Sequence, residues 1–151
     1  MNFTRALGLS AAVVALTGTM LMSGATNAFA DPNFTFSVER SGKNFSIEVY
    51  NNHIRAGFAD WQADPDKSIT PAIPGDALQV RDALSNGWGV EALAVAQAGG
   101  SGYRTATTRG HNALYVSSWK TGNLKEGTPI IVQVCAVRGE KSQCGSAYGK
   151  A

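Results

Sequence analysis

The chain carries few of the side chains that enzymes use for acid–base catalysis. His53 and His111 are its two histidines, and His111 ends the run Arg109-Gly110-His111, which follows several threonines. A guanidinium beside an imidazole and hydroxyl groups can bind an anion or take part in proton transfer. The same residues can instead support the backbone of a polar turn. Because no Gly-x-Ser-x-Gly nucleophile motif accompanies them, we predict a binding role for Arg109 and His111 and no catalytic residue.

Three carboxylates lie close together in the chain, at Asp60, Asp64 and Asp66. Oxygen ligands at alternate positions are typical of the start of a calcium-binding loop, but such a loop needs Gly at its sixth position and Glu at its twelfth. This chain has Ile69 and Gly75 there. The carboxylates could also form a glycosidase pair, which depends on a carboxyl separation that sequence does not supply. We therefore predict no metal and no cofactor, and we interpret Asp64 and Asp66 as a solvated turn that contributes to binding.

Aromatic residues are the other candidates for recognition. The chain has three tryptophans, Trp61, Trp88 and Trp119, and these could stack on sugar rings together with Tyr103 and Tyr115 if they lined an exposed face. Large aromatic side chains in a small domain more often belong to the core, and we expect this of Trp61 and Trp88. Serines and a lysine flank Trp119, so Trp119 is the aromatic residue that we predict to bind a partner.

Cys135 and Cys144 are the two cysteines of the chain. If Gly139-Glu140 is a two-residue hairpin loop of type II′, the cysteines stand directly opposite each other. Counting outward from the turn places them at a non-hydrogen-bonded pair, where Cα atoms lie about 4.5 Å apart, at the near edge of disulfide geometry. Redox-active and metal-binding cysteines need Cys-x-x-Cys spacing or nearby histidines, which this pair lacks. We predict a disulfide.

Strands must position these side chains, because apolar and polar residues alternate over most of the chain. Turn-forming residues separate the alternating segments, and three prolines make 62–75 the longest loop. The expected strands are 34–38, 45–49, 53–61, 77–84, 88–96, 103–108, 115–119, 128–138 and 141–148. This pattern predicts an all-β fold, an antiparallel β-sandwich of about seven to nine strands of the immunoglobulin-like kind.

The segment 77–84 is ambiguous, because Asp76 could cap a short helix there. We choose a strand, since Leu78, Val80 and Leu84 also fit one and Asn86-Gly87 follows. Asn-Gly is a strong signal for a two-residue hairpin. We therefore expect this strand to pair with the next one along the chain.

Residues 1–30 have the pattern of a secretory signal peptide. Arg5 is the single charge of this segment, an apolar stretch follows, and the segment ends in Ala-Phe-Ala, which suits a signal peptidase. Polar residues interrupt the apolar stretch before it reaches the length of a membrane-spanning helix. We predict cleavage between Ala30 and Asp31, no membrane anchor, and secretion of a single domain, 31–151.

The charge of the mature chain is nearly balanced. Of 13 Lys and Arg residues one is Arg5, so 12 remain against 11 Asp and Glu residues, a net charge of one. Binding to nucleic acid or to anionic lipid depends on clustered cations. We therefore expect neither as a partner.

Several short segments in the second half of the chain carry turn and strand signatures. They are Pro74-Gly75-Asp76 to Arg81-Asp82, Asn86-Gly87-Trp88-Gly89-Val90-Glu91, Thr107-Thr108-Arg109-Gly110-His111, Leu124-Lys125-Glu126-Gly127 and Val134-Cys135-Ala136-Val137. Together they resemble small secreted proteins of filamentous actinobacteria. The resemblance implies export and transfers no catalytic residue. The final hairpin is also loosely similar to the last strands of fibronectin type III and immunoglobulin-like domains, which is an analogy of fold alone.

The leading hypothesis is a non-enzymatic extracellular protein that binds a protein or glycan partner through loops 62–75 and 109–112, because loops on a rigid scaffold commonly carry recognition. One alternative is an inhibitor of a secreted hydrolase that presents the proline-rich loop. Another is a carbohydrate-binding module or glycan hydrolase that uses Trp119, Tyr103 and Asp60.

Overall fold

The computed structural model describes residues 32–97 and 102–151, which belong to one compact unit, Asp31–Ala151. The predicted signal peptide, its cleavage site and most of the glycine-rich turn at 98–102 lie outside the described residues.

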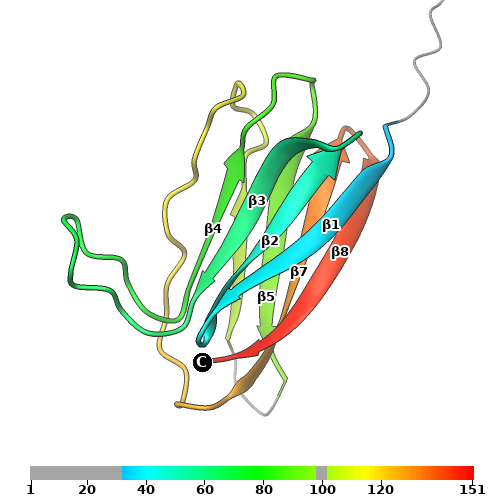
Figure 1. Ribbon diagram of the computed structural model, residues 1–151. Helices are drawn as coiled ribbons and strands as arrows, with labels where there is room; N and C mark the ends of the chain where they lie inside the picture. Colours follow the sequence, from blue (N-terminus) through cyan, green and yellow to red (C-terminus); the bar gives the residue numbers. More distant parts are fainter. Residues whose placement is uncertain (1–31, 98–101) are drawn as a thin grey trace, which may run out of the picture. The chain divides into compact units, whose positions relative to one another are not determined.

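Eight antiparallel strands form two sheets of four, and the described residues contain no helix (Figure 1). The strands are β1 (Phe34–Ser41), β2 (Asn44–Asn51), β3 (Ile54–Gln62), β4 (Ala77–Asp82), β5 (Gly89–Ala96), β6 (Tyr103–Thr107), β7 (Pro129–Arg138) and β8 (Lys141–Lys150). The first sheet has the order β1-β2-β3-β4 and the second the order β6-β5-β7-β8. The all-β class and the β-sandwich are confirmed. The first sheet takes its strands consecutively, whereas an immunoglobulin constant-type sheet has the order A-B-E-D.

The core lies between the sheets and is built from alternate residues of the strands. Ile47, Val49, Leu78 and Val80 from the first sheet meet Val90, Val132 and Val134 from the second, and all are almost completely buried. Trp61 and Trp88 join this cluster at 1% and 6% exposure, which confirms their structural role. Because strand side chains alternate between faces, the same alternation directs the polar residues outward.

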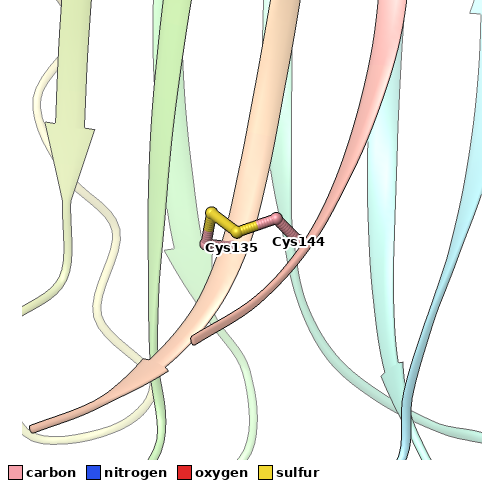
Figure 2. Close-up of a disulfide and its surroundings, with 2 residues drawn as sticks. All are labelled: Cys135 and Cys144. Atoms are coloured by element: carbon pink, nitrogen blue, oxygen red, sulfur yellow. A yellow bond between two sulfur atoms is a disulfide. The ribbon is translucent and has the colours of Figure 1, made fainter. Parts of the chain in front are cut away.

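The first two strands and the last two strands form local hairpins, and the last hairpin has the predicted register. β1 and β2 pair across Gly42-Lys43, and β7 and β8 pair so that Arg138 faces Lys141 and Cys135 faces Cys144. Gly139 has a φ of 56°, the left-handed conformation that the first position of this turn requires. The cysteines form the predicted disulfide across the two strands, with their Cα atoms 4.0 Å apart (Figure 2).

The predicted hairpin between 77–84 and 88–96 is wrong. β4 is a strand, but it pairs with β3, whereas β5 pairs with β6 and β7 in the other sheet. Both strands carry a buried apolar face, and the chain buries the two faces against each other by crossing the sandwich. Asn86 Oδ1 accepts a hydrogen bond from the Trp88 amide at 2.9 Å, and Gly87 has a φ of 76°. The Asn-Gly pair therefore turns a longer connection between sheets.

The predicted strand 115–119 is also wrong, although its residues lie alongside β4. Tyr115 and Ser117 bond to the backbone of Asp82 and Val80 in one register, and Lys120 bonds to Leu78 in a register shifted by one residue. Ser117 Oγ accepts the Val80 amide at 3.1 Å inside this irregular stretch. One extra residue between Ser117 and Lys120 interrupts the ladder, as in a β-bulge. The segment still covers the edge of β4.

At the opposite edge of the sandwich, aromatic side chains of β1 and β2 pack on glycines of β8. A Cβ on Gly145 would lie 2.5 Å from Cγ of Phe36, and one on Gly149 would overlap the Phe45 ring. Trp61 Nε1 also donates to the backbone oxygen of Lys150 at 3.1 Å. The two sheets thus meet here through aromatic rings that pack on bare backbone.

Candidate functional site

The two loops that the sequence assigns to binding lie at opposite ends of the first sheet. Loop 63–76 leads into the start of β4. Residues 115–120 run antiparallel to β4, with Tyr115 beside its last residue, so 109–112 lie at the other end. Figure 1 shows the two connections at the two ends of β4. Each end has its own hollow, and no single face presents both loops.

The first hollow, the Trp119 groove, lies on the outer face of the first sheet beside loop 63–76 and has a volume of about 330 Å³. It is lined by Glu39, Arg40, Ser41, Asn44, Phe45, Ser46, Asp60, Trp61, Gln62, Ile73 and Trp119. The structure thereby brings together Trp119 and Asp60, two residues that the sequence suggested for glycan recognition, and adds polar side chains from three strands.

Strand pairing explains the polar floor of the groove. Glu39 pairs with Ser46, and Ser46 pairs with Asp60, so three oxygen-bearing side chains cross the sheet in one row. Their neighbours Phe45 and Trp61 point into the core. Alternation alone therefore places carboxylates and a hydroxyl on the outer face.

Two amide side chains shape the wall of the groove. Asn44 Oδ1 accepts the Ala63 amide at 2.9 Å, and Gln62 Nε2 donates to the Asp64 carbonyl at 2.7 Å. Both bonds hold the start of loop 63–76, the loop that supplies Ile73 to the lining. These two hydrogen bonds therefore fix the backbone that forms the wall of the groove.

Trp119 differs from the other two tryptophans. It is half-buried and projects from the bulged segment beside β4. Trp61 donates its indole N–H to Lys150, whereas among the described residues none accepts a hydrogen bond from the indole of Trp119. A half-exposed aromatic surface with a free donor is available to a ligand.

Asp60 has an unusual electrostatic environment. Burial raises the pKa of Asp60, and the negative charge of Glu48 raises it further, while hydrogen bonding with Ser46 and the charge of Arg55 act in the opposite direction. Glu48 is itself buried and forms an ion pair with Arg55, whose guanidinium lies 4.5 Å from the centre of the Phe58 ring. Arg55 thus pairs with Glu48, and the Asp60 carboxyl oxygens can accept hydrogen bonds from the hydroxyl groups of a ligand.

The second hollow, the end cavity, has a volume of about 450 Å³ and lies between the β4–β5 connection, the segment after β6 and the β7–β8 turn. It brings together the predicted residues Arg109 and His111. Arg109 forms an ion pair with Glu91 at 2.9 Å and donates to the Gly139 carbonyl at 2.8 Å. The His111 ring stacks on Tyr115 with centroids 3.7 Å apart. These contacts give both side chains a role in holding loops.

Two charged residues of the end cavity were missed by the sequence reading. Asp82 is 4% exposed, accepts the Leu84 amide through Oδ1 at 3.1 Å, and has a pKa raised by burial. It continues the inward register of Leu78 and Val80, a signal that marks a buried carboxylate. Arg138, at the end of β7, also lines the cavity.

Asp64 and Asp66 line neither hollow. Asp64 lies 3.6 Å from Nζ of Lys43. Asp66 accepts both the amide and the hydroxyl of Ser68, and these bonds lower its pKa. In the described part of the chain, no three His, Cys, Asp or Glu residues gather as they would around a metal ion. The assignment of Asp64 and Asp66 to binding stays a prediction.

Tyr103 lies apart from the Trp119 groove. It projects from β6 in the second sheet, is 74% exposed, and belongs to an outward-facing row with Val95, Ile131 and Tyr148. It cannot act together with Trp119 on one sugar ring.

Within 32–97 and 102–151, the structure contains no helix long and apolar enough to span a membrane. Comparison of the chain with protein-family models, with curated proteins and with solved structures finds no match. The resemblance to secreted actinobacterial proteins stays a prediction, and function has to be argued from the two hollows.

Proposed function

We propose that this chain is an extracellular, non-enzymatic binding module and that the Trp119 groove binds a neutral glycan. The observation that carries the proposal is a half-exposed indole beside a row of outward polar side chains in one groove. A sugar ring has an apolar face of C–H groups and a rim of hydroxyls. The indole of Trp119 would stack on the apolar face of the sugar. The oxygens of Glu39, Ser46 and Asp60 would accept hydrogen bonds from its hydroxyl groups.

The charge of the groove supports a neutral ligand. Glu39 and Asp60 are acidic, and Arg40 is the one cation in the lining. The Arg40 guanidinium lies 5.1 Å from the centre of the Phe45 ring and donates to the Tyr148 carbonyl at 2.9 Å. Because this cation is engaged, an anionic polysaccharide would meet net repulsion.

The disulfide supports the extracellular part of the proposal. The disulfide between Cys135 and Cys144 fits a protein of an oxidising compartment. Polysaccharides of cell surfaces are among the molecules that such a protein meets.

Retention on immobilised neutral polysaccharides tests the proposal. The purified protein should bind at least one of cellulose, chitin or a β-glucan, and Trp119→Ala should weaken binding by about tenfold or more. Tyr103→Ala is the matched control, because Tyr103 is an exposed aromatic residue of the other sheet. Failure of the protein to bind any neutral glycan, or equal losses in the two variants, would remove the proposal. Release of reducing ends over time would assign hydrolysis to the groove instead.

The backbone hydrogen bonds within loop 63–76 favour a second candidate function, inhibition of a secreted protease. Asp66 and Ile73 exchange two backbone hydrogen bonds of 2.9 and 2.8 Å, and Asp76 bonds back to Ala63 at 2.8 Å. The residues between Asp66 and Ile73 are exposed, with Ile69 at 48%. A preorganised exposed loop loses little entropy on binding a protease cleft. Stoichiometric loss of protease activity on titration would support this function, and no loss across serine, cysteine and metallo-proteases would exclude it.

A further inference from the structure

The end cavity holds charges of both signs that do not pair with each other. Asp82 and Arg138 both line it, at the ends of β4 and β7. It lies at the opposite end of β4 from the Trp119 groove, so a ligand here would be independent of the proposed glycan.

No cation of residues 32–97 and 102–151 forms an ion pair with Asp82. Among the described residues, its carboxylate accepts one hydrogen bond, from the Leu84 amide to Oδ1. Removing a carboxylate from water without a counter-ion is costly, and burial accordingly raises the pKa of Asp82. The residue nonetheless lines an open cavity with a volume of about 450 Å³, within the range of small-molecule sites.

The other titratable groups of the cavity do not neutralise Asp82. Arg109 pairs with Glu91 and bonds to the Gly139 carbonyl. His111 stacks flat on Tyr115, at an interplanar angle of 3°. The two basic side chains of the segment after β6 are therefore engaged elsewhere.

Arg138 lacks an anion. It is exposed, and its register partner across the β7–β8 turn is Lys141, a second cation. In the described part of the chain, no carboxylate lies within ion-pair distance of its guanidinium. The cavity thus offers a buried acceptor for a cation and, at its rim, a fork of donors for a carboxylate.

We propose that the end cavity binds a small zwitterion, a free amino acid or a short peptide, with its ammonium at Asp82 and its carboxylate at Arg138. A ligand with only an ammonium group would pair with Asp82 and be repelled by Arg138. A ligand with only a carboxylate would pair with Arg138 and be repelled by Asp82. The buried Trp88 side chain contributes an apolar part of the lining.

Titration of the ¹⁵N-labelled protein with the common L-amino acids and with dileucine, followed by NMR, tests this inference. At least one zwitterion should shift amide resonances of the end cavity with saturation below about 10 mM. Its N-acetyl and its carboxamide derivatives should each bind about tenfold more weakly, because each lacks one charge. A preference between the amino acid and the dipeptide separates the two sources of the zwitterion.

Two substitutions assign the charges. Asp82→Asn keeps an oxygen for the Leu84 amide and should abolish the preference for the free amine over its N-acetyl form. Arg138→Gln should abolish the preference for the carboxylate over the carboxamide. Asp60→Asn, in the Trp119 groove, is the control and should leave both preferences unchanged. Saturation by no zwitterion, or preferences that survive Asp82→Asn and Arg138→Gln, would overturn the proposal.

Discussion

Replacing both cysteines with serine should lower the free energy of unfolding by an amount that follows from the position of the disulfide. Cys135 and Cys144 are 9 positions apart, and closing a loop of that length lowers the entropy of the unfolded chain by about 8.6 cal/mol/K, or about 2.6 kcal/mol at 25 °C. For a domain of about 120 residues this corresponds to a decrease in Tm of roughly 10 °C.

The loss should come from the unfolded state, because the disulfide lies outside the core. Cys144 is exposed and Cys135 is half-buried, on the outer face of the second sheet. Serine therefore leaves no core cavity, and the strand register is still held by the turn at Gly139. Chain connectivity rather than packing accounts for the expected magnitude.

Urea denaturation of the wild-type protein and of Cys135→Ser/Cys144→Ser measures this loss. The wild-type protein in excess reductant should unfold at the same urea concentration as the double variant, since both lack the crosslink. A loss below about 1 kcal/mol would refute the reasoning, because that is far less than the loop-closure entropy requires. A clear difference between the reduced protein and the double variant would show that serine itself perturbs the hairpin.

Three further predictions concern packing, pH and loop anchoring. Gly145→Ala should destabilise the protein by about 1–3 kcal/mol, because the added Cβ would lie 2.5 Å from Cγ of Phe36. Urea denaturation of this variant, of Phe36→Ala and of the double variant should show that most of this loss depends on the Phe36 ring. Burial raises the pKa of Asp60, so the folded state binds the proton of this carboxyl more tightly than the unfolded state does. The Asp60→Asn variant should therefore be more stable than the wild type at pH 7. Urea denaturation at several pH values should show that this gain shrinks as the pH falls through the raised pKa toward the ordinary value of 3.8. Arg109→Ala should cost less than about 1 kcal/mol, since its ion pair with Glu91 is partly exposed, but hydrogen exchange should speed up in 108–114 and at the Gly139 turn; unchanged exchange would contradict a loop-holding role for Arg109.

Features that depend on neighbouring residues could be predicted from the sequence. The final hairpin is the clearest case, because a two-residue turn and a side-chain period of two determine which residues face each other. The pairing of Cys135 with Cys144, the two cysteines of the chain, agreed with that count. The burial of Trp61 and Trp88 followed from the general cost of exposing large aromatic side chains.

Features that depend on sheet membership could not be predicted in this way. Asn86-Gly87 allows a tight turn in any longer connection, so it does not say whether β5 returns beside β4 or crosses to the other sheet. The one-residue shift between Ser117 and Lys120 is likewise a product of pairing with β4. The position of Trp119 and Asp60 in one groove depends on the membership of β4 in the first sheet and on this shift.

Asp82 belongs between these cases. Its position two residues after Val80 continues the inward alternation of β4, so a buried carboxylate was foreseeable once 77–84 was taken as a strand. Its place in the lining of the end cavity depends on the segment after β6 and on the β7–β8 turn, which form the rest of the lining. That part depends on tertiary structure.

The central claim is that Trp119 contacts a neutral glycan. The most direct measurement follows the indole N–H resonances of the three tryptophans by NMR while a soluble neutral oligosaccharide is added. The resonance of Trp119 should shift and saturate, while that of Trp61, whose indole donates to Lys150, should stay in place. An unmoved Trp119 resonance across cello-, chito- and β-gluco-oligosaccharides, or a shift confined to Trp88 at the end cavity, would contradict the account.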